Sequence, residues 1–161
     1  MVLLVAAACS SSPHPGVAQI QGTMPALTGE LMQGGRLAPA EYRDRIVVVN
    51  FWNPFCGPCR EEAPSLERAW EDLRGIGVLV VGVHYVGGDW PSSVGAARTY
   101  LRQFGVTYPI LEDPSSSLAR AFGIQGIPST VVAARGGLVY RILGPVKPGQ
   151  IEGLVYPLRP A

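Results

Sequence analysis

Two cysteines separated by two residues follow a run of large apolar residues, and this junction constrains the fold more than any other feature of the chain. The run Ile46–Trp52 is almost entirely β-branched and aromatic, a pattern typical of a strand buried on both faces. After Cys56, apolar residues recur as on one face of a helix: Leu66, Ala69, Trp70 and Leu73. Gly75 stands where that helix should end. We therefore expect a strand, a short loop and a helix that begins at the first cysteine.

Strand and helix patterns continue to alternate downstream. A second buried strand is expected over Val78–Val83, and a helix over Ser92–Phe104. The apolar face of that helix is expected to comprise Val94, Ala97, Leu101 and Phe104. The next helix is expected to begin at Pro114, to be capped by Asp113 and to end before Gly123.

Glycine pairs mark two hairpins around this alternation. One is expected over Thr28–Leu37, and the other joins Thr130–Ala133 to Leu138–Ile142. A last helix is expected over Pro148–Tyr156. Strands that alternate with helices and close with a hairpin predict an α/β domain, with a central mixed β-sheet and helices on both faces.

Size and charge limit the class of protein. The chain has 161 residues, 47% of them hydrophobic, which suits one folded domain, placed here at residues 26–161. Lys and Arg total 13 against 12 for Asp and Glu, so the net charge is +1. This near-neutral balance lacks the basic surface of a nucleic-acid binder, and no nucleic-acid partner is expected.

The N-terminus resembles a bacterial lipoprotein signal. Residues 1–8 are apolar and end in small residues directly before Cys9. The resemblance implies that residues 1–8 are removed and that Cys9 carries the lipid, which would attach the protein to the membrane surface. Residues 9–25, rich in Ser, Pro, Gly and Gln, are then expected to form a flexible tether. The alternative is a frayed apolar N-terminus with an idle thiol.

The position of the cysteine pair gives its two thiols different properties. A helix start offers free main-chain N–H groups and partial positive charge, which favour a thiolate over a thiol. We therefore expect Cys56, at the exposed end, to be the attacking thiolate. Cys59 lies one turn further in and can form or resolve a disulfide with it. Gly57 leaves room for a partner's backbone, and Pro58 stiffens the turn and influences how reducing the pair is.

Three other uses of the cysteines compete with disulfide exchange. A structural zinc site needs four ligands, and the remaining candidates are Cys9, His14 and His84. A peroxidatic cysteine of the peroxiredoxin type follows a Thr or Ser by three residues, where this chain has Asn53. A copper chaperone spaces its cysteines by three residues and supplies a loop histidine. The pattern favours exchange, with neither a metal nor a cofactor.

The motif around the cysteines extends to a five-residue pattern, W-x-x-x-C-x-x-C-x-x-E-x-P, formed by Trp52, Cys56, Cys59, Glu62 and Pro64. In this it resembles the TlpA/ResA-like thioredoxin family of extracytoplasmic, membrane-tethered thiol–disulfide oxidoreductases. The resemblance covers about residues 27–144.

The resemblance implies a thioredoxin fold in which Tyr85–Asp113 contains an inserted strand and helix. The segment Ile124–Thr130 looks like the cis-proline loop of the family, so Pro128 is expected to be cis and to pack against the disulfide. The backbone of Ile127 is then free to pair with a substrate strand. The other residues expected to meet the substrate are Trp52, Phe55, Gly57 and Pro58.

Glu62 is the candidate proton carrier. It lies on the inward stripe of the expected helix, four residues before Leu66. Burial raises the pKa of a carboxyl group, and an acid that ionises near neutral pH can pass a proton to or from Cys59. Asn50 occupies the place where many thioredoxins have a buried Asp, which strengthens the case for Glu62. The alternative is an exposed glutamate at a helix start, like Glu61.

These features predict an extracytoplasmic thiol–disulfide oxidoreductase that exchanges disulfides with protein substrates. The Gly-Pro dipeptide between the cysteines favours a reductase. The resemblance implies substrates such as the haem-binding cysteines of apocytochrome c and a membrane thiol–disulfide donor of the DsbD/CcdA type. Two alternatives stay open: a disulfide-forming oxidase of the same fold, and a non-catalytic thioredoxin-fold lipoprotein that binds a partner or a metal ion.

Overall fold

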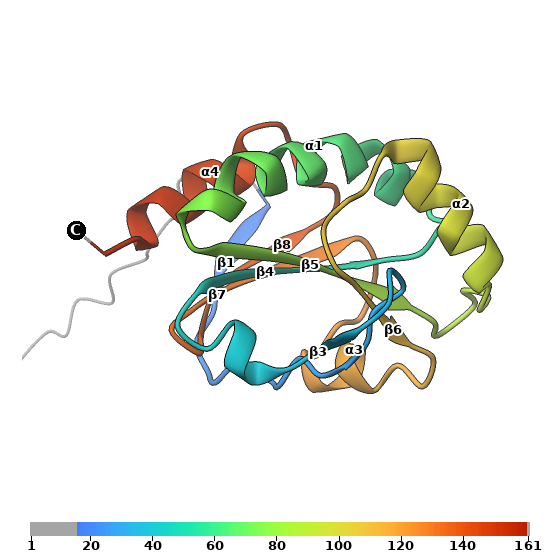
Figure 1. Cartoon of the computed structure of the whole chain (residues 1–161), viewed down its shortest axis with the longest axis horizontal. Coiled ribbons are helices and arrows are strands. Elements are labelled where there is room, and N and C mark those ends of the chain that lie inside the picture. Colours follow the sequence, from blue (N-terminus) through green and yellow to red (C-terminus); the bar gives the residue numbers. More distant parts are fainter. Residues whose placement is uncertain (1–15, 161) are drawn as a thin grey trace, which may run out of the picture.

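A six-stranded sheet runs through the centre of the computed structural model, which describes residues 16–160 (Figure 1). The strands lie in the order β1-β8-β7-β4-β5-β6. Their bounds are Val17–Gln19 (β1), Ile46–Trp52 (β4), Val78–Tyr85 (β5), Ile110–Asp113 (β6), Ser129–Ala134 (β7) and Gly137–Leu143 (β8). Strand β4 is parallel to β5 and antiparallel to β7, which confirms the expected mixed sheet.

Helices cover both faces of this sheet (Figure 1). One face carries α1 (Gly57–Leu73), α2 (Val94–Phe104) and α4 (Gln150–Val155). The other carries α3 (Ser117–Ala121) and the hairpin of β2 (Gly29–Glu30) and β3 (Arg36–Leu37). Residues 16–160 also contain three short 3-10 helices: Pro39–Glu41, Arg74–Ile76 and Tyr156–Leu158.

Strand β4 supplies side chains to a core on each side of the sheet. Val48 and Trp52 join the cluster under α1, whereas Val49 and Phe51 join the cluster on the α3 side. All seven residues of the strand are buried. A central strand with two buried faces explains why its sequence is a continuous apolar run rather than an alternating one.

Two helical details differ from the prediction. Helix α3 begins at Ser117 rather than Pro114, because Asp113 is the last residue of β6. The Asp113 carboxylate still serves the helix start, since it accepts hydrogen bonds from the Ala119 N–H and the Ser117 hydroxyl, both at 3.0 Å. In α2, Val94 is exposed instead of buried.

The predicted tether is wrong for part of its length. Strand β1 (Val17–Gln19) pairs antiparallel with β8, and the Leu138 N–H donates to the Gly22 carbonyl at 2.8 Å. These are main-chain bonds, which need no apolar pattern in the sequence to form. The folded domain therefore begins before residue 26. The predicted signal segment and Cys9 lie outside the described residues.

Within residues 16–160, no helix is long and apolar enough to span a bilayer.

Candidate active site

The loop between β4 and α1 is anchored by a buried asparagine. The Oδ1 atom of Asn53 accepts a hydrogen bond from the Phe55 N–H at 3.1 Å, while its Nδ2 donates to the carbonyls of Tyr85 (2.9 Å) and Pro91 (3.2 Å). The loop is thus tied to the end of β5 and to the segment before α2. This role explains why an amide, and not a hydroxyl, stands three residues before Cys56.

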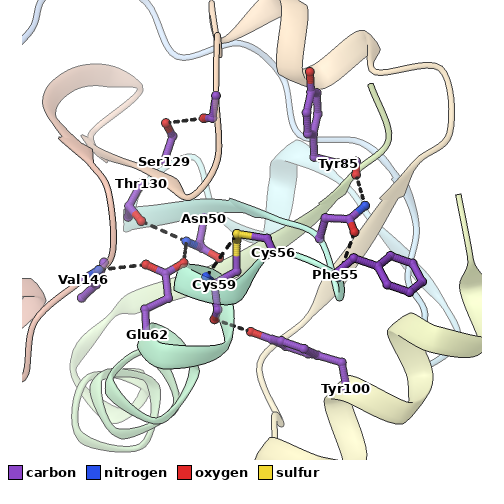
Figure 2. Close-up of a disulfide and its surroundings, with 12 residues drawn as sticks. Asn50, Phe55, Cys56, Cys59, Glu62, Tyr85, Tyr100, Ser129, Thr130 and Val146 are labelled. Carbon is purple, nitrogen blue, oxygen red and sulfur yellow. Dashed lines mark hydrogen bonds between the residues drawn. A yellow bond between two sulfur atoms is a disulfide. The ribbon is translucent and has the colours of Figure 1, made fainter. Parts of the chain in front are cut away.

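The two cysteines form a disulfide at the start of α1 (Figure 2). Cys56 is the N-cap of the helix, and its sulfur accepts a hydrogen bond from the Cys59 N–H at 3.2 Å. A free N–H at a helix start stabilises negative charge on the atom that it contacts. The structure therefore provides the contact that favours a thiolate on Cys56 when the pair is reduced.

The expectation that Cys56 lies exposed is wrong for this oxidised structure. Its side chain is 1% exposed and that of Cys59 is 0% exposed. The disulfide turns the Cys56 sulfur toward Cys59, inside the apolar cluster that contains Trp52 and Leu66. An incoming thiolate can therefore reach this sulfur only when the surrounding surface moves.

The predicted substrate-binding residues of this segment divide into two groups. Phe55, which is 52% exposed, lies next to the disulfide on the surface together with the exposed Gly57 and Pro58. The space around Gly57 is open, since a Cβ built there meets no atom within 4 Å. Trp52 is 1% exposed, so the prediction that it meets the substrate is wrong in this state. It packs in the core because the last side chain of β4 faces α2.

The loop before β7 lies at the same end of the sheet. The Ile127–Pro128 peptide is cis, which confirms that prediction. Ser129 is paired with Phe51 of β4, and this register brings Pro128 to the end of β4 from which the cysteine loop leaves. A groove of about 430 Å³ opens beside the proline. Its lining comprises Gly123, Gln125, Gly126, Ile127, Pro128, Ser129, Arg141, Leu143 and Gly144.

Glu62 is buried, which confirms its place on the inward stripe of α1. It is 1% exposed, whereas Glu61 lies on the surface. One carboxylate oxygen accepts from the Asn50 side-chain amide at 2.7 Å and the other from the Val146 N–H at 2.8 Å (Figure 2). Burial, the dominant effect, outweighs these two bonds and raises the pKa of Glu62 to about 7. This carboxyl group can gain and lose a proton near neutral pH.

Two aromatic residues near the site were not assigned a role from the sequence. The Tyr100 hydroxyl donates to the Cys59 carbonyl at 2.7 Å, and the ring stacks on Trp52 with 4.3 Å between centroids. Tyr100 lies three residues after the buried Ala97 and four before Phe104, so the helical spacing could have identified it. The His84 ring also lies against Trp52, with 5.5 Å between centroids, and burial lowers the pKa of this imidazole.

The described residues contain no group of three His, Cys, Asp or Glu side chains placed to hold a metal ion. Of the spare zinc candidates, His84 is buried beside Trp52, and Cys9 and His14 lie outside the described range.

Comparison with known proteins places this arrangement in a family. The model of the AhpC/TSA family matches residues 20–142. The thiol:disulfide interchange protein HelX of Rhodobacter capsulatus is 32% identical over 145 residues, which span 83% of this chain and 77% of that protein. The thiol-disulfide oxidoreductase ResA of Halalkalibacterium halodurans is 24% identical over 113 residues, which span 70% of this chain but only 61% of that relative.

The fold is also found among solved structures. A secreted Mycobacterium tuberculosis disulfide oxidoreductase, homologous to Escherichia coli DsbE, superposes with a TM-score of 0.71 at 21% identity, covering 82% of this chain and 96% of that one. With the family match and the HelX similarity, we conclude that this chain belongs to the AhpC/TSA family and is a thiol–disulfide oxidoreductase of the thioredoxin fold.

Proposed function

We propose that this protein reduces disulfides in protein substrates outside the cytoplasm, with Cys56 as nucleophile, Cys59 as resolving thiol and Glu62 as proton carrier. The observation that carries the proposal is the buried Glu62. It lies on the same helix as the cysteine pair, and its pKa is raised to about 7. A carboxyl that titrates near neutral pH can take the proton that a thiol must lose before it attacks.

The proposed cycle starts from the disulfide seen here. A membrane dithiol donor of the DsbD/CcdA type first reduces Cys56–Cys59. The Cys56 thiolate then attacks one sulfur of the substrate disulfide, and the other substrate sulfur leaves as a thiolate. Cys59 loses its proton to Glu62 and attacks Cys56, which restores the protein disulfide and releases the second substrate thiol. Two electrons pass from the protein dithiol to the substrate.

The groove beside Pro128 suits an extended substrate segment. Its wall includes the backbone of Ile127, which can pair with a substrate strand, and the exposed Leu143. Phe55 offers an apolar contact near the disulfide. The haem-binding cysteines of apocytochromes c are the substrates that the sequence resemblance favours.

The proposed location rests on the N-terminal sequence. The apolar residues 1–8 followed by Cys9 support export and lipid attachment, and a relative described as secreted has the same fold. Mass spectrometry of the mature protein from membranes tests this, with diacylglyceryl on Cys9 expected. An unmodified Met1 would refute the lipid anchor.

Reduction of insulin disulfides with a dithiol donor tests the cysteine roles. Cys56→Ser is expected to abolish activity, and Cys59→Ser to accumulate a mixed disulfide with the substrate. The matched control is Cys9→Ser, which removes the one other cysteine of the chain and should leave the rate unchanged in solution. Full activity of Cys56→Ser would point instead to a non-catalytic binder.

The reduction potential of the pair tests the direction. A reductase is expected to lie near the value of thioredoxin, about −270 mV. A potential near that of the oxidant DsbA, about −120 mV, would assign the protein to disulfide formation instead.

A further inference from the structure

The resolving cysteine is held by a residue from outside its own helix. The Tyr100 hydroxyl, in α2, donates to the Cys59 carbonyl oxygen at 2.7 Å (Figure 2). The tyrosine is 3% exposed, and its ring is fixed between Trp52 (4.3 Å between centroids) and Phe104 (4.8 Å). A hydroxyl held this way can fix the main chain at Cys59.

The first turns of α1 have few such restraints of their own. Gly57 is conformationally free. Pro64 lacks the N–H that an α-helix needs at that position to bind the Arg60 carbonyl. The helix is therefore short of one internal bond directly after Cys59, so the external bond from Tyr100 matters more there than it would in a regular helix.

We propose that Tyr100 is a positioning residue for the second half of disulfide exchange, in which Cys59 attacks the mixed disulfide on Cys56. This rests on the proposed roles of the two cysteines. In that step the Cys59 thiolate forms a bond to the Cys56 sulfur, the bond from Cys56 to the partner's sulfur breaks, and the partner leaves as a thiolate. When the Cys56–Cys59 bond is open, Tyr100 keeps the Cys59 backbone where the sulfurs can meet.

The effect falls chiefly on one step. Attack by Cys56 on an external disulfide uses only the Cys59 N–H, which the start of α1 presents to its sulfur, whereas the internal attack also depends on the position of the Cys59 sulfur. Burial keeps the Tyr100 pKa well above the ordinary value for tyrosine, so the phenol remains a donor at neutral pH. Helix α2 thus influences the chemistry of the pair through the position of Cys59.

Ellman's reagent separates the two steps, because each releases one coloured thiolate from the aromatic disulfide. The reduced full-length protein, with Cys9→Ser in every variant so that Cys9 releases no thiolate of its own, reacts first through Cys56 and then through Cys59. In Tyr100→Phe we expect the second release to slow about 5- to 10-fold, the effect of losing one hydrogen bond, with the first release unchanged within about 2-fold. Phenylalanine keeps the stacking on Trp52.

The matched control is Tyr42→Phe. Tyr42 is equally buried, and its hydroxyl donates to the Leu27 carbonyl at 3.0 Å in the core on the other face of the sheet. Tyr42→Phe loses this bond and also the 2.7 Å bond that the hydroxyl accepts from the Leu27 N–H, which is at least as much as Tyr100→Phe loses, but it should keep both release rates. As a second measurement, hydrogen exchange of residues 57–63 in the reduced protein should accelerate in Tyr100→Phe and not in Tyr42→Phe.

The possible outcomes are distinct. Three results would overturn the role of Tyr100. In Tyr100→Phe these are a second release at the wild-type rate, or an equal slowing of both releases. The third is a second release that slows as much in Tyr42→Phe as in Tyr100→Phe. A wild-type protein that shows no second release would instead refute the proposed resolving role of Cys59.

Discussion

The side-chain amide of Asn50 donates a 2.7 Å hydrogen bond to the Glu62 carboxylate, and both residues are 1% exposed. The same amide nitrogen donates to the Thr130 hydroxyl at 3.0 Å, so Asn50 links β4, α1 and β7 behind the disulfide. Because Asn50 is neutral, the pair contains one ionisable group instead of two. The carboxyl group therefore titrates without a like charge beside it.

Asn50→Asp should make stability strongly dependent on pH. It removes the donor and places a second carboxylate against Glu62, which is unfavourable once both are ionised. We expect a loss of unfolding free energy on the order of 3 kcal/mol at pH 8 and a clearly smaller loss at pH 5, measured by denaturant unfolding. Asn50→Ala separates the two effects, since it loses the bond without adding charge. Equal pH dependence of the two variants would contradict this account.

Glu62→Gln should remove a pH dependence of the unfolding free energy that the wild-type protein shows. The carboxyl titrates at about 7 in the folded state and 4.5 in the reference state, so the native protein holds a proton that the unfolded chain has released. Stability therefore falls as the pH rises through this range, by about 3 kcal/mol in total. Denaturant unfolding from pH 4.5 to 8 should show this fall in the wild type and in the exposed control Glu61→Gln, but not in Glu62→Gln.

Glu62→Gln also tests whether Glu62 takes the proton from Cys59. The rate of the internal attack by Cys59 should change its slope near pH 7 in the wild type and lose that inflection in Glu62→Gln. An unchanged pH profile would rule out Glu62 as the group that takes the proton.

Gly82→Ala should destabilise the core around Trp52. A Cβ at this position would lie 2.5 Å from the Ile110 Cδ1 atom, 3.0 Å from the Trp52 Nε1 atom and 3.2 Å from the Tyr108 Cε2 atom. Because the two rings are fully buried, we expect a loss of about 2 kcal/mol in unfolding free energy. The control Gly95→Ala, in α2 with no atom within 4 Å, should gain up to about 1 kcal/mol instead. Wild-type stability of Gly82→Ala would show that the core adjusts freely.

Phe55→Ser should weaken exchange with proteins but not with small disulfides. The ring is 52% exposed beside Cys56, so it can contact a protein substrate without supporting the core. We expect kcat/KM for insulin to fall about 5-fold, as for a contact worth about 1 kcal/mol, with the rate toward a small aromatic disulfide unchanged. Tyr156→Ser, 51% exposed outside the site, is the control and should leave both rates unaltered. A parallel fall of both rates would assign Phe55 a structural role.

Much of the architecture was predictable because local patterns and global packing agree. Strand β4 coincides with its apolar run, and α1 begins directly after the first cysteine as predicted. The start of α3 was misplaced because Pro114 suits both a first helical turn and the turn that follows a strand. Strand β1 was missed because pairing with β8 uses main-chain bonds that leave no periodic trace.

By itself the sequence determined the chemistry. It shows which residues carry thiols, that the helix begins at Cys56, and that Glu62 lies on the inward stripe of this helix one turn after Cys59. These follow from short-range spacing, which a helix or strand converts directly into geometry. Only the tertiary structure decided that the Cys56 sulfur is buried in the oxidised state and that Tyr100 reaches the Cys59 carbonyl. Both depend on the packing of α2 and the sheet against α1, contacts between residues some forty positions apart that no local pattern encodes.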